Sequence, residues 1–406
     1  MRRIGLFAAA LAAVAPLAPV GAQAPGEPSA VADISCDRAC LIGAVRGYVD
    51  ALRARDPAAA PLAEDAVFTE NNVILPVGKG LWGSVTDVDK TGLEVADPLT
   101  GNAAWFGSVR ENGQPAIFAV RVHVQGGKID QIESVVHRKT ALPAPFGNTE
   151  NMTHDPAFNE VLPPEQRRPR ERLRAIADSY FDTVELNDGQ VFAPFDEDCG
   201  RLENGISTTS RARDGVQGFT LVDGCEAQFK LGIYRINKRI RERLYPIIDV
   251  ERGVVVASGF FDHANEWDRY LLTDGREMKT ALKWPNSITL LEAFRIKDAK
   301  ISRIEAVFTY VPYFMHNPWA GPDSSPPKYK VDPSACDAAC LTSLANATMA
   351  AYVSKDWNSL PWADAVGYAE NSVGIRVGES IWRTVTAVGA KPLIVADAQT
   401  GKAAWI

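Results

Sequence analysis

The last part of the chain repeats its first part at an interval of 300 positions, without a gap. A repeat of this kind indicates that one type of domain is used more than once, so the fold is built from copies of that domain. The first copy continues to about Lys139, whereas the last ends soon after Trp405, so we expect an incomplete final unit. The matching segments are Cys36–Leu41 with Cys336–Leu341, Glu70-Asn71 with Glu370-Asn371, Val95–Asp97 with Val395–Asp397, and Ala103–Trp105 with Ala403–Trp405.

The middle of the chain carries three landmarks of the first copy in the same order. This shared order predicts that the middle unit is the same domain after divergence. The landmarks are Glu203-Asn204 for Glu70-Asn71, Asp249-x-x-x-Gly253 for Asp97-x-x-x-Gly101, and Lys300–Glu305 for Lys128–Glu133.

Two proline-rich segments divide the chain. Such segments disfavour regular structure and are typical of linkers or wrapping arms.

The insert at 264–285 has no counterpart in the first copy. Its aromatic residues suit a lid over a cavity, a cover for a sheet edge or a contact between units. The expected parts are a signal peptide (1–24), unit 1 (30–141), a linker (142–169), unit 2 (170–316), a second linker (317–333) and an incomplete unit 3 (334–406).

The first residues read as a secretory signal peptide. Arg2 and Arg3 precede the apolar run Ile4–Ala15, and small residues suited to cleavage follow. The run is too short to span a membrane. We therefore expect an exported protein, periplasmic or extracellular, without a membrane span.

Six cysteines in an exported chain favour disulfides over metal binding. Equivalent copies should form equivalent bonds, which narrows the possible pairings; zinc binding is the less favoured alternative. The expected disulfides are Cys36–Cys40, Cys199–Cys225 and Cys336–Cys340.

Units 1 and 2 each open with apolar residues at helical spacing and close with strand signals. A helix followed by a curved antiparallel sheet is an α+β plan. The helix faces are Leu41, Val45, Tyr48, Val49 and Leu52 in unit 1, and Leu173, Ile176, Ala177, Tyr180 and Val184 in unit 2. The closing strand pairs are 117–125 with 129–138, and 288–297 with 301–311.

The segment Ala66–Asn71 and the Gly-Lys-Ile-x-x-Ile-Glu hairpin at 127–133 resemble NTF2-like, or SnoaL-like, domains. The resemblance implies tandem cones of curved sheet wrapped on helices, each with a pocket at its open end. The superfamily includes isomerases, dehydratases, epoxide hydrolases, cyclases and non-catalytic binders, so the fold does not fix the function. No catalytic set of these subfamilies matches this chain residue by residue.

Several function classes are disfavoured. The net charge of −7 gives no general attraction to nucleic acid. Motifs typical of serine hydrolases, nucleoside triphosphatases, zinc proteases and dinucleotide-binding enzymes are absent from the sequence. We expect no cofactor and no metal, a small-molecule ligand as partner, and packing between units or between two copies of the chain.

Unit 2 holds the best concentration of candidate catalytic groups. An apolar cavity raises the pKa of a carboxyl group, and a neighbouring donor can then stabilise a developing oxyanion. We expect Asp262 or His263 to be the general base, with Arg201 or Tyr310 as electrophile. Glu203 and Asn204 complete the catalytic candidates; the candidate ligand-binding residues are Arg241, Arg243, Trp267, Tyr270 and His316.

Structural roles compete with these functional ones. The Glu-Asn pair occurs in all three units, which also fits a turn or a bond to a neighbouring strand. Asp262-His263 could be an ordinary polar strand end, and His316 an exposed linker residue. Arg239, Arg241 and Arg243 would share one strand face, either solvated or binding a carboxylate. In unit 1 the face with Arg121, His123, Glu133 and His137 is expected to be exposed or at an interface between units.

The sequence favours an exported, cofactor-independent lyase, isomerase or hydratase acting on a small organic molecule, which could carry a carboxylate. The alternative is a non-catalytic ligand-binding or scaffold protein. An enzyme needs a titratable group and a hydrogen-bond donor at one enclosed point, whereas a binder can have a single polar anchor.

Overall fold

The structure is a computed structural model that describes residues 36–140, 142–209, 224–266, 268–320, 336–363 and 366–406. The expected signal peptide and Trp267 lie outside these described residues. None of the helices in these ranges is long and apolar enough to cross a membrane. All three predicted disulfides are confirmed: Cys36–Cys40, Cys199–Cys225 and Cys336–Cys340.

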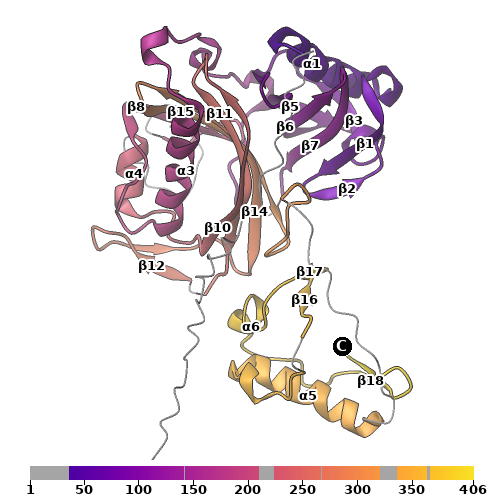
Figure 1. Cartoon of the computed structure of the whole chain (residues 1–406). Helices are drawn as coiled ribbons and strands as arrows, with labels where there is room; N and C mark the ends of the chain where they lie inside the picture. The colour runs from indigo at the N-terminus through magenta and orange to yellow at the C-terminus, as the bar shows by residue number, and fades with distance from the viewer. Residues whose placement is uncertain (1–35, 141, 210–223, 267, 321–335, 364–365) are drawn as a thin grey trace, which may run out of the picture. The chain divides into compact units, whose positions relative to one another are not determined.

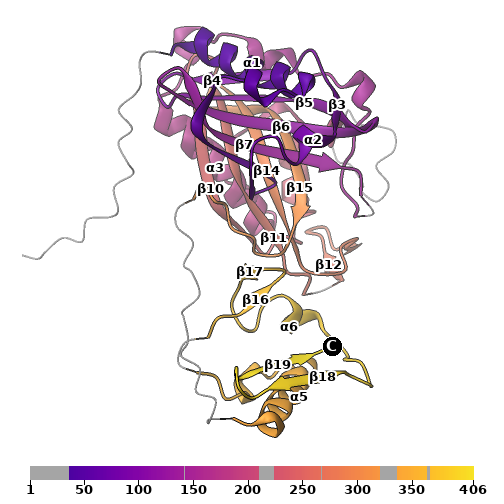
Figure 2. The same ribbon diagram turned by 90° about the vertical axis from the view of Figure 1, so that its right-hand side faces the viewer.

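The first helix, α1 (Arg38–Ala54), precedes a seven-stranded sheet. The side chain of Asp37 caps the start of α1, and Arg55 ends the helix with a left-handed backbone. Figure 2 shows α1 lying across this sheet. The sheet elements are β1 (Leu62–Glu70), β2 (Val73–Leu75), β3 (Val85–Val88), β4 (Leu93–Asp97), β5 (Asn102–Glu111), β6 (Gln114–Gln125) and β7 (Lys128–Arg138), with a short helix α2 (Leu81–Ser84) before β3.

The second helix, α3 (Arg170–Leu186), precedes a six-stranded sheet. Helices α3 and α4 (Cys225–Leu231) lie on one side of this sheet (Figure 1). Residues 264–285 connect β11 to β14 and form a two-stranded hairpin, β12 (Arg269–Leu271) with β13 (Glu277–Lys279). The sheet strands are β8 (Phe195–Glu203), β9 (Ile206–Ser207), β10 (Arg239–Asp249), β11 (Val254–His263), β14 (Asn286–Lys297) and β15 (Lys300–Val311).

The two sheets have the same strand order. The first runs β2-β1-β7-β6-β5-β3, and the second, from the corresponding edge, runs β9-β8-β15-β14-β11-β10. In each, one parallel pair (β1 with β7, β8 with β15) interrupts an otherwise antiparallel arrangement. The predicted α+β fold is therefore confirmed, with a helix packed on a curved sheet in each of the first two units. Common origin of the two units stays a prediction.

One face of each sheet packs on its own helix, and the other faces form a shared apolar cluster. Ile117 and Phe106 of the first sheet belong to this cluster together with Ile247 and Leu291 of the second. Because these outer faces are buried against each other, the space between helix and sheet is the place for a cavity in each unit.

The last described part of the chain repeats the beginning of the first unit. Glu370 accepts a hydrogen bond from the amide of Ile381, as Glu70 does from Leu81. Its elements are α5 (Ala338–Ser354), β16 (Ala369–Glu370), β17 (Val373–Gly374), α6 (Ile381–Thr384), β18 (Ile394–Asp397) and β19 (Lys402–Trp405).

Candidate active site

A cavity of about 240 Å³ lies between α3 and the second sheet. Most of its lining is apolar or aromatic, including Tyr180, Phe261 and Phe308. Its polar lining includes two carboxyl groups, those of Glu203 and Glu292. An apolar pocket with a few convergent polar groups is the usual form of a small-molecule site.

The strand register brings Glu203 and Glu292 to the same level of the sheet. Ala306 on β15 is paired with Glu292 on β14 on one side and with Glu203 on β8 on the other. Two strand spacings separate the Cα atoms of the glutamates by roughly 10 Å. Because the residue between them is an alanine, both longer side chains can extend over it into the cavity.

Glu292 has the properties of an acid at neutral pH. It is almost fully buried, and its Oε2 has no hydrogen-bond partner within the described part of the chain. Burial, together with the negative charge of Glu203, raises the pKa of Glu292 to about 8. Two carboxyl groups in one apolar site cannot easily both ionise, so Glu292 keeps its proton at neutral pH.

A buried arginine stands beside Glu203. Nη1 of Arg201 lies 3.6 Å from the Glu203 carboxylate. Nη2 of Arg201 donates to the Gln228 side chain and the Tyr234 hydroxyl, and its guanidinium lies 5.1 Å from the centroid of the Phe229 ring. These contacts hold Arg201 behind Glu203, so it compensates the charge of that carboxylate.

The contacts of His263 define its tautomer. The amide nitrogen of Asn286 donates to the carbonyl of Trp284 (3.0 Å), so the amide oxygen of Asn286 faces His263. Nδ1 of His263 donates to that oxygen (2.9 Å), and Nε2 is left as an acceptor. Burial lowers the pKa of His263, which keeps the ring neutral.

His263 is too far from Glu292 to act on the same bond. His263 is paired with Asn286, six residues from Glu292 along β14, which corresponds to about 20 Å at roughly 3.4 Å per residue. The cavity therefore has an inner end with Glu203 and Glu292, and an outer end with His263 and Tyr310. The Tyr310 hydroxyl donates to the carbonyl of Pro143 (2.8 Å).

Two further polar atoms of the lining have no hydrogen-bond partner among the residues that the structure describes. They are Oγ1 of Thr208 and Oδ1 of Asn237, and both residues are buried. Buried polar groups in native proteins are normally hydrogen-bonded, so unpartnered groups around one cavity indicate a ligand with hydrogen-bonding groups of its own.

The first unit lacks this arrangement. Val120 and Ser134 occupy the positions that correspond to Glu292 and Ala306 in the strand register. Glu70, the counterpart of Glu203, accepts from the amide of Leu81 (2.6 Å) and from Arg138 (2.8 Å). Glu70 thus caps helix α2, whereas Glu203 lines a cavity.

The insert covers part of this cavity. Tyr270, Met278 and Leu282 belong to its lining, and the hydroxyl of Tyr270 donates to the carbonyl of Ile233 (2.7 Å). Among the uses considered for the insert, these contacts favour a cover over the cavity.

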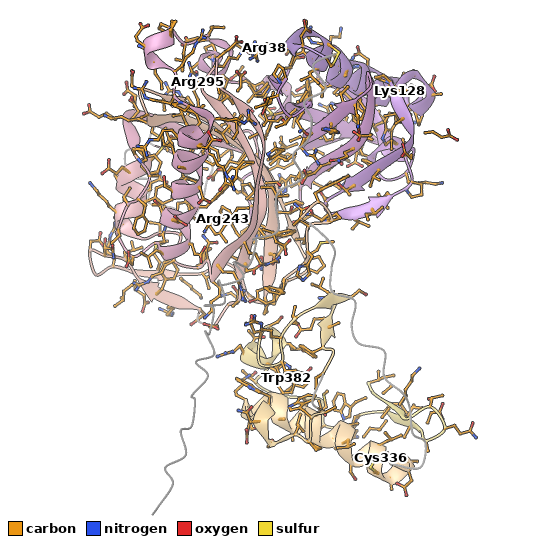
Figure 3. The ribbon with its side chains drawn as sticks, viewed as in Figure 1. Arg38, Lys128, Arg243, Arg295, Cys336 and Trp382 are labelled. Atoms are coloured by element: carbon orange, nitrogen blue, oxygen red, sulfur yellow. A yellow bond between two sulfur atoms is a disulfide. The ribbon has the colours of Figure 1, made fainter. Side chains whose placement is uncertain are left out.

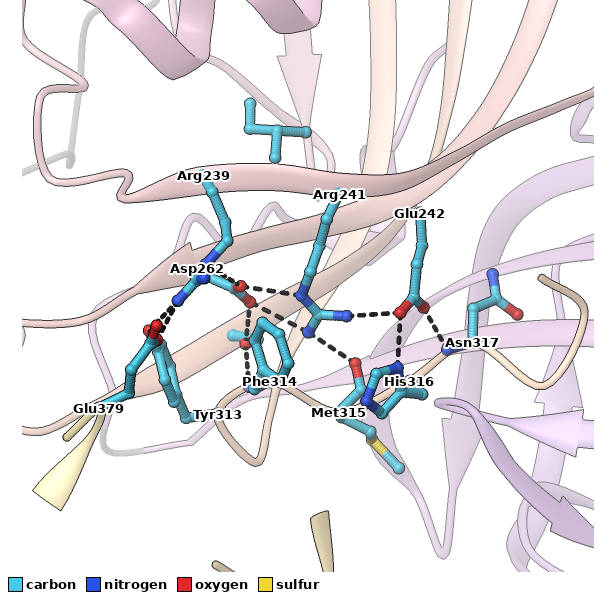
Figure 4. Close-up of polar contacts among 12 residues, drawn as sticks. Arg239, Arg241, Glu242, Asp262, Tyr313, Phe314, Met315, His316, Asn317 and Glu379 are labelled. Carbon is cyan, nitrogen blue, oxygen red and sulfur yellow. Dashed lines mark hydrogen bonds and ion pairs between the residues drawn. The ribbon is translucent and has the colours of Figure 1, made fainter. Parts of the chain in front are cut away.

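Asp262 does not line the cavity. It alternates with His263 on β11, and its carboxylate accepts from Nε (2.8 Å) and Nη2 (3.1 Å) of Arg241 and from the Ser287 hydroxyl (2.6 Å). Nε of Arg239 lies 3.0 Å from the same carboxylate (Figure 4). These contacts give Asp262 a structural role, so we do not retain it as the base.

The expectation that Arg243 shares a face with Arg239 and Arg241 is wrong. Glu242 has a φ of 52° and the register of β10 shifts there, so a bulge turns Arg243 to the other side. Arg243 pairs with Asp182 (2.6 Å) and Glu185 (2.6 Å) on α3 (Figure 3). Both Arg241 and Arg243 are thus occupied by carboxylates and lie outside the cavity lining.

Asn204 has the structural role considered for the Glu-Asn pair. It adopts a left-handed backbone (φ 46°), as Asn71 and Asn371 do (φ 50° each). Its side chain donates to the carbonyl of Phe308 (3.1 Å) and accepts from the Phe308 amide (2.9 Å). Asn71 makes the same pair of bonds to Val136.

The remaining candidates lie away from the cavity. Nδ1 of His316 is 2.7 Å from the Glu242 carboxylate. In the first unit, the face expected to be exposed or at an interface between units is buried: Arg121 and Glu133 form an ion pair (2.8 Å), and the His137 ring lies 6.3 Å from that of Phe308 on the second sheet, which favours the interface. Among the described residues no cluster of three or more His, Cys, Asp or Glu side chains could hold a metal ion.

The comparisons with known proteins concern parts of the chain. The profile of a family described as a domain of unknown function (DUF8021) matches residues 166–308, which include both glutamates of the cavity. No curated protein matches the chain.

Several solved structures are similar to parts of the chain. An NTF2-like protein of unknown function from Cytophaga hutchinsonii is 15% identical, over 23% of this chain and 85% of its own, with a TM-score of 0.19. A protein of unknown function with a cystatin-like fold from Methylobium petroleophilum is 21% identical, over 33% of this chain and 98% of its own, with a TM-score of 0.20.

Proposed function

We propose that the chain is an exported, cofactor-independent enzyme of the lyase, isomerase or hydratase kind, with its active site in the cavity of residues 170–316. The observation that carries this proposal is the pair of carboxyl groups on one apolar cavity, of which Glu292 has a pKa of about 8 and a free oxygen. Environments that separate the pKa values of two neighbouring groups supply an acid and a base together.

In the proposed mechanism, the Glu203 carboxylate removes a proton from a substrate carbon. The Glu292 carboxyl donates a hydrogen bond, or its proton, to the substrate oxygen on which negative charge develops. Return of the proton to another carbon completes an isomerisation, and loss of a protonated hydroxyl as water completes a dehydration. Arg201, held by Gln228 and Tyr234, positions Glu203.

The chemistry of the cavity indicates the kind of substrate. Its apolar lining favours an apolar body, and the free acceptors of Thr208, Asn237 and His263 favour hydroxyl or amino groups on it. A neutral molecule fits these groups better than the carboxylate-bearing substrate considered from the sequence, because two glutamates already occupy the inner end. The competing function is a binding protein for the same class of ligand.

Deuterium exchange tests the proposal without knowledge of the product. A panel of neutral cyclic ketones and hydroxyketones is incubated with the protein in D₂O, and deuterium uptake at carbon is measured by mass spectrometry. We expect uptake with at least one compound, lowered by about 10²- to 10⁴-fold in Glu292→Gln and Glu203→Gln.

Glu64→Gln, at an exposed carboxyl group of the first unit, is the matched control and should keep the wild-type rate. Binding of panel compounds without any exchange would favour the binding protein. Equal exchange in all variants would contradict the assignment of the two glutamates.

A further inference from the structure

The segment after the first sheet forms part of the cavity of the second. We call residues 142–148 the arm; it follows β7 closely along the chain, and Pro143 and Pro145 belong to the cavity lining. Proline restricts the backbone and donates no hydrogen bond, so this piece of the arm is stiff and presents an apolar surface. The wall of the cavity is thus shared between the second unit and the segment that joins it to the first.

Two hydrogen bonds attach the arm along the cavity. The hydroxyl of Tyr310 donates to the carbonyl of Pro143 at the outer end (2.8 Å). The amide of Gly147 donates to the carbonyl of Asn204, next to Glu203 at the inner end (2.8 Å). The arm therefore runs from one end of the cavity to the other.

Close backbone contact holds the inner attachment. A Cβ added to Gly147 would lie 2.3 Å from the carbonyl oxygen and 2.5 Å from the carbonyl carbon of Gly205. Only glycine permits this approach, because the opposing atoms are backbone and cannot rotate away. Any side chain at position 147 must push the arm off the cavity.

Aromatic contacts connect the arm to both units. The ring of Phe146 lies 5.6 Å from that of His137 on β7, and the His137 ring lies 6.3 Å from that of Phe308. Phe308 lines the cavity. A displacement of the arm would therefore change the cavity, even though Phe146 and His137 do not line it.

We propose that the arm is a specificity-determining wall of this site, which excludes water from it and limits the ligands that it accepts. This inference rests on the proposed function for the identity of the site. It makes ligand binding by residues 170–316 depend on a segment that the first unit positions.

The test uses Gly147→Ala in the full chain. Gly43→Ala is the matched control, because a Cβ at Gly43 meets no atom within 4 Å. The probe is a series of 4-alkylphenols, neutral molecules with one hydroxyl group and an apolar body of graded length, whose binding is measured by calorimetry. If displacement of the arm exposes roughly 60 Å² of bound probe to water, Gly147→Ala weakens binding about tenfold.

A second readout needs no ligand. The ionisation of Glu292, followed by the infrared band of its protonated carboxyl group, should move from about pH 8 toward the ordinary carboxyl range when water enters the cavity. Tyr310→Phe, which keeps the ring but removes the bond to Pro143, should change both readouts in the same direction.

Wild-type ionisation of Glu292 in both Gly147→Ala and Tyr310→Phe would overturn the proposal, whether or not the phenols bind. Because the infrared readout does not depend on catalysis, it separates a failure of the arm from a failure of the proposed function. A failure of the proposed function would appear as deuterium exchange in Glu292→Gln that is as fast as in the wild type.

Discussion

Replacement of Glu292 by glutamine is expected to stabilise the protein above about pH 8 and to remove part of its loss of stability between about pH 5 and pH 8. The folded state raises the pKa of Glu292 from 4.5 to about 8. Between these values the folded protein binds a proton that the unfolded chain has released. The free energy of unfolding therefore falls as the pH rises through this window and levels off above it.

The upper limit of this effect is about 5 kcal/mol, from roughly 1.4 kcal/mol for each pH unit of difference between the two states. Glutamine carries no charge at any of these pH values, so the variant lacks this contribution. Urea denaturation of wild type and variant at a series of pH values measures the difference. Parallel stability curves across the window would contradict a protonated Glu292.

Asp262→Ala is expected to destabilise the protein by about 3 to 5 kcal/mol, because it removes a buried partner of charged groups. Asp262 is fully buried, and its carboxylate holds the side chains of Arg239, Arg241 and Ser287. Loss of the carboxylate leaves the two arginines facing each other, with Glu379 and Glu242 as their remaining carboxylate partners.

The same variant should leave the cavity chemistry intact. Folded Asp262→Ala is expected to catalyse deuterium exchange at the wild-type rate, since Asp262 does not line the cavity. Asp274→Ala, at an exposed carboxyl group of the insert, controls for the loss of a surface charge and should change stability much less than Asp262→Ala does. Wild-type stability combined with lost exchange would return Asp262 to the catalytic site.

Much of the fold could be predicted from the sequence because it follows from periodicity. The helical spacing from Leu173 to Val184 lies within α3, and the strand predicted at 288–297 lies within β14. The disulfides could be paired because equivalent units should form equivalent bonds. These features depend on local pattern or on the repeat, and both are visible in one sequence.

The site was harder to predict. Strand alternation places neighbouring residues on opposite faces of the sheet, but it does not show which face points into the cavity. Asp262 and His263 both follow an apolar strand, and only the tertiary structure shows that His263 lines the cavity and Asp262 does not. Glu292 was missed. The sequence feature that indicates it is a single carboxylate between Leu291 and Ala293, in a strand whose other residues are mostly buried. Burial of a carboxylate is costly unless the group has a role.

Local irregularities account for the other difference. The bulge at Glu242 places Arg243 on the face opposite Arg241, and no turn residue in the sequence indicates a bulge there. The sequence predicts a linker or a wrapping arm for this proline-rich segment, but it does not predict the contact with the cavity, because that contact depends on where Gly147 meets Gly205.

The most direct test of the account is an infrared titration of the carboxyl groups in the wild-type chain and in Glu292→Gln. Near pH 7 ordinary carboxyl groups are ionised, so any remaining band of a protonated carboxyl group belongs to one with a raised pKa. We expect one such band in the wild type, lost at about pH 8 and absent from Glu292→Gln. A wild-type spectrum without a protonated carboxyl group above about pH 6 would contradict the acid and base roles assigned to Glu292 and Glu203.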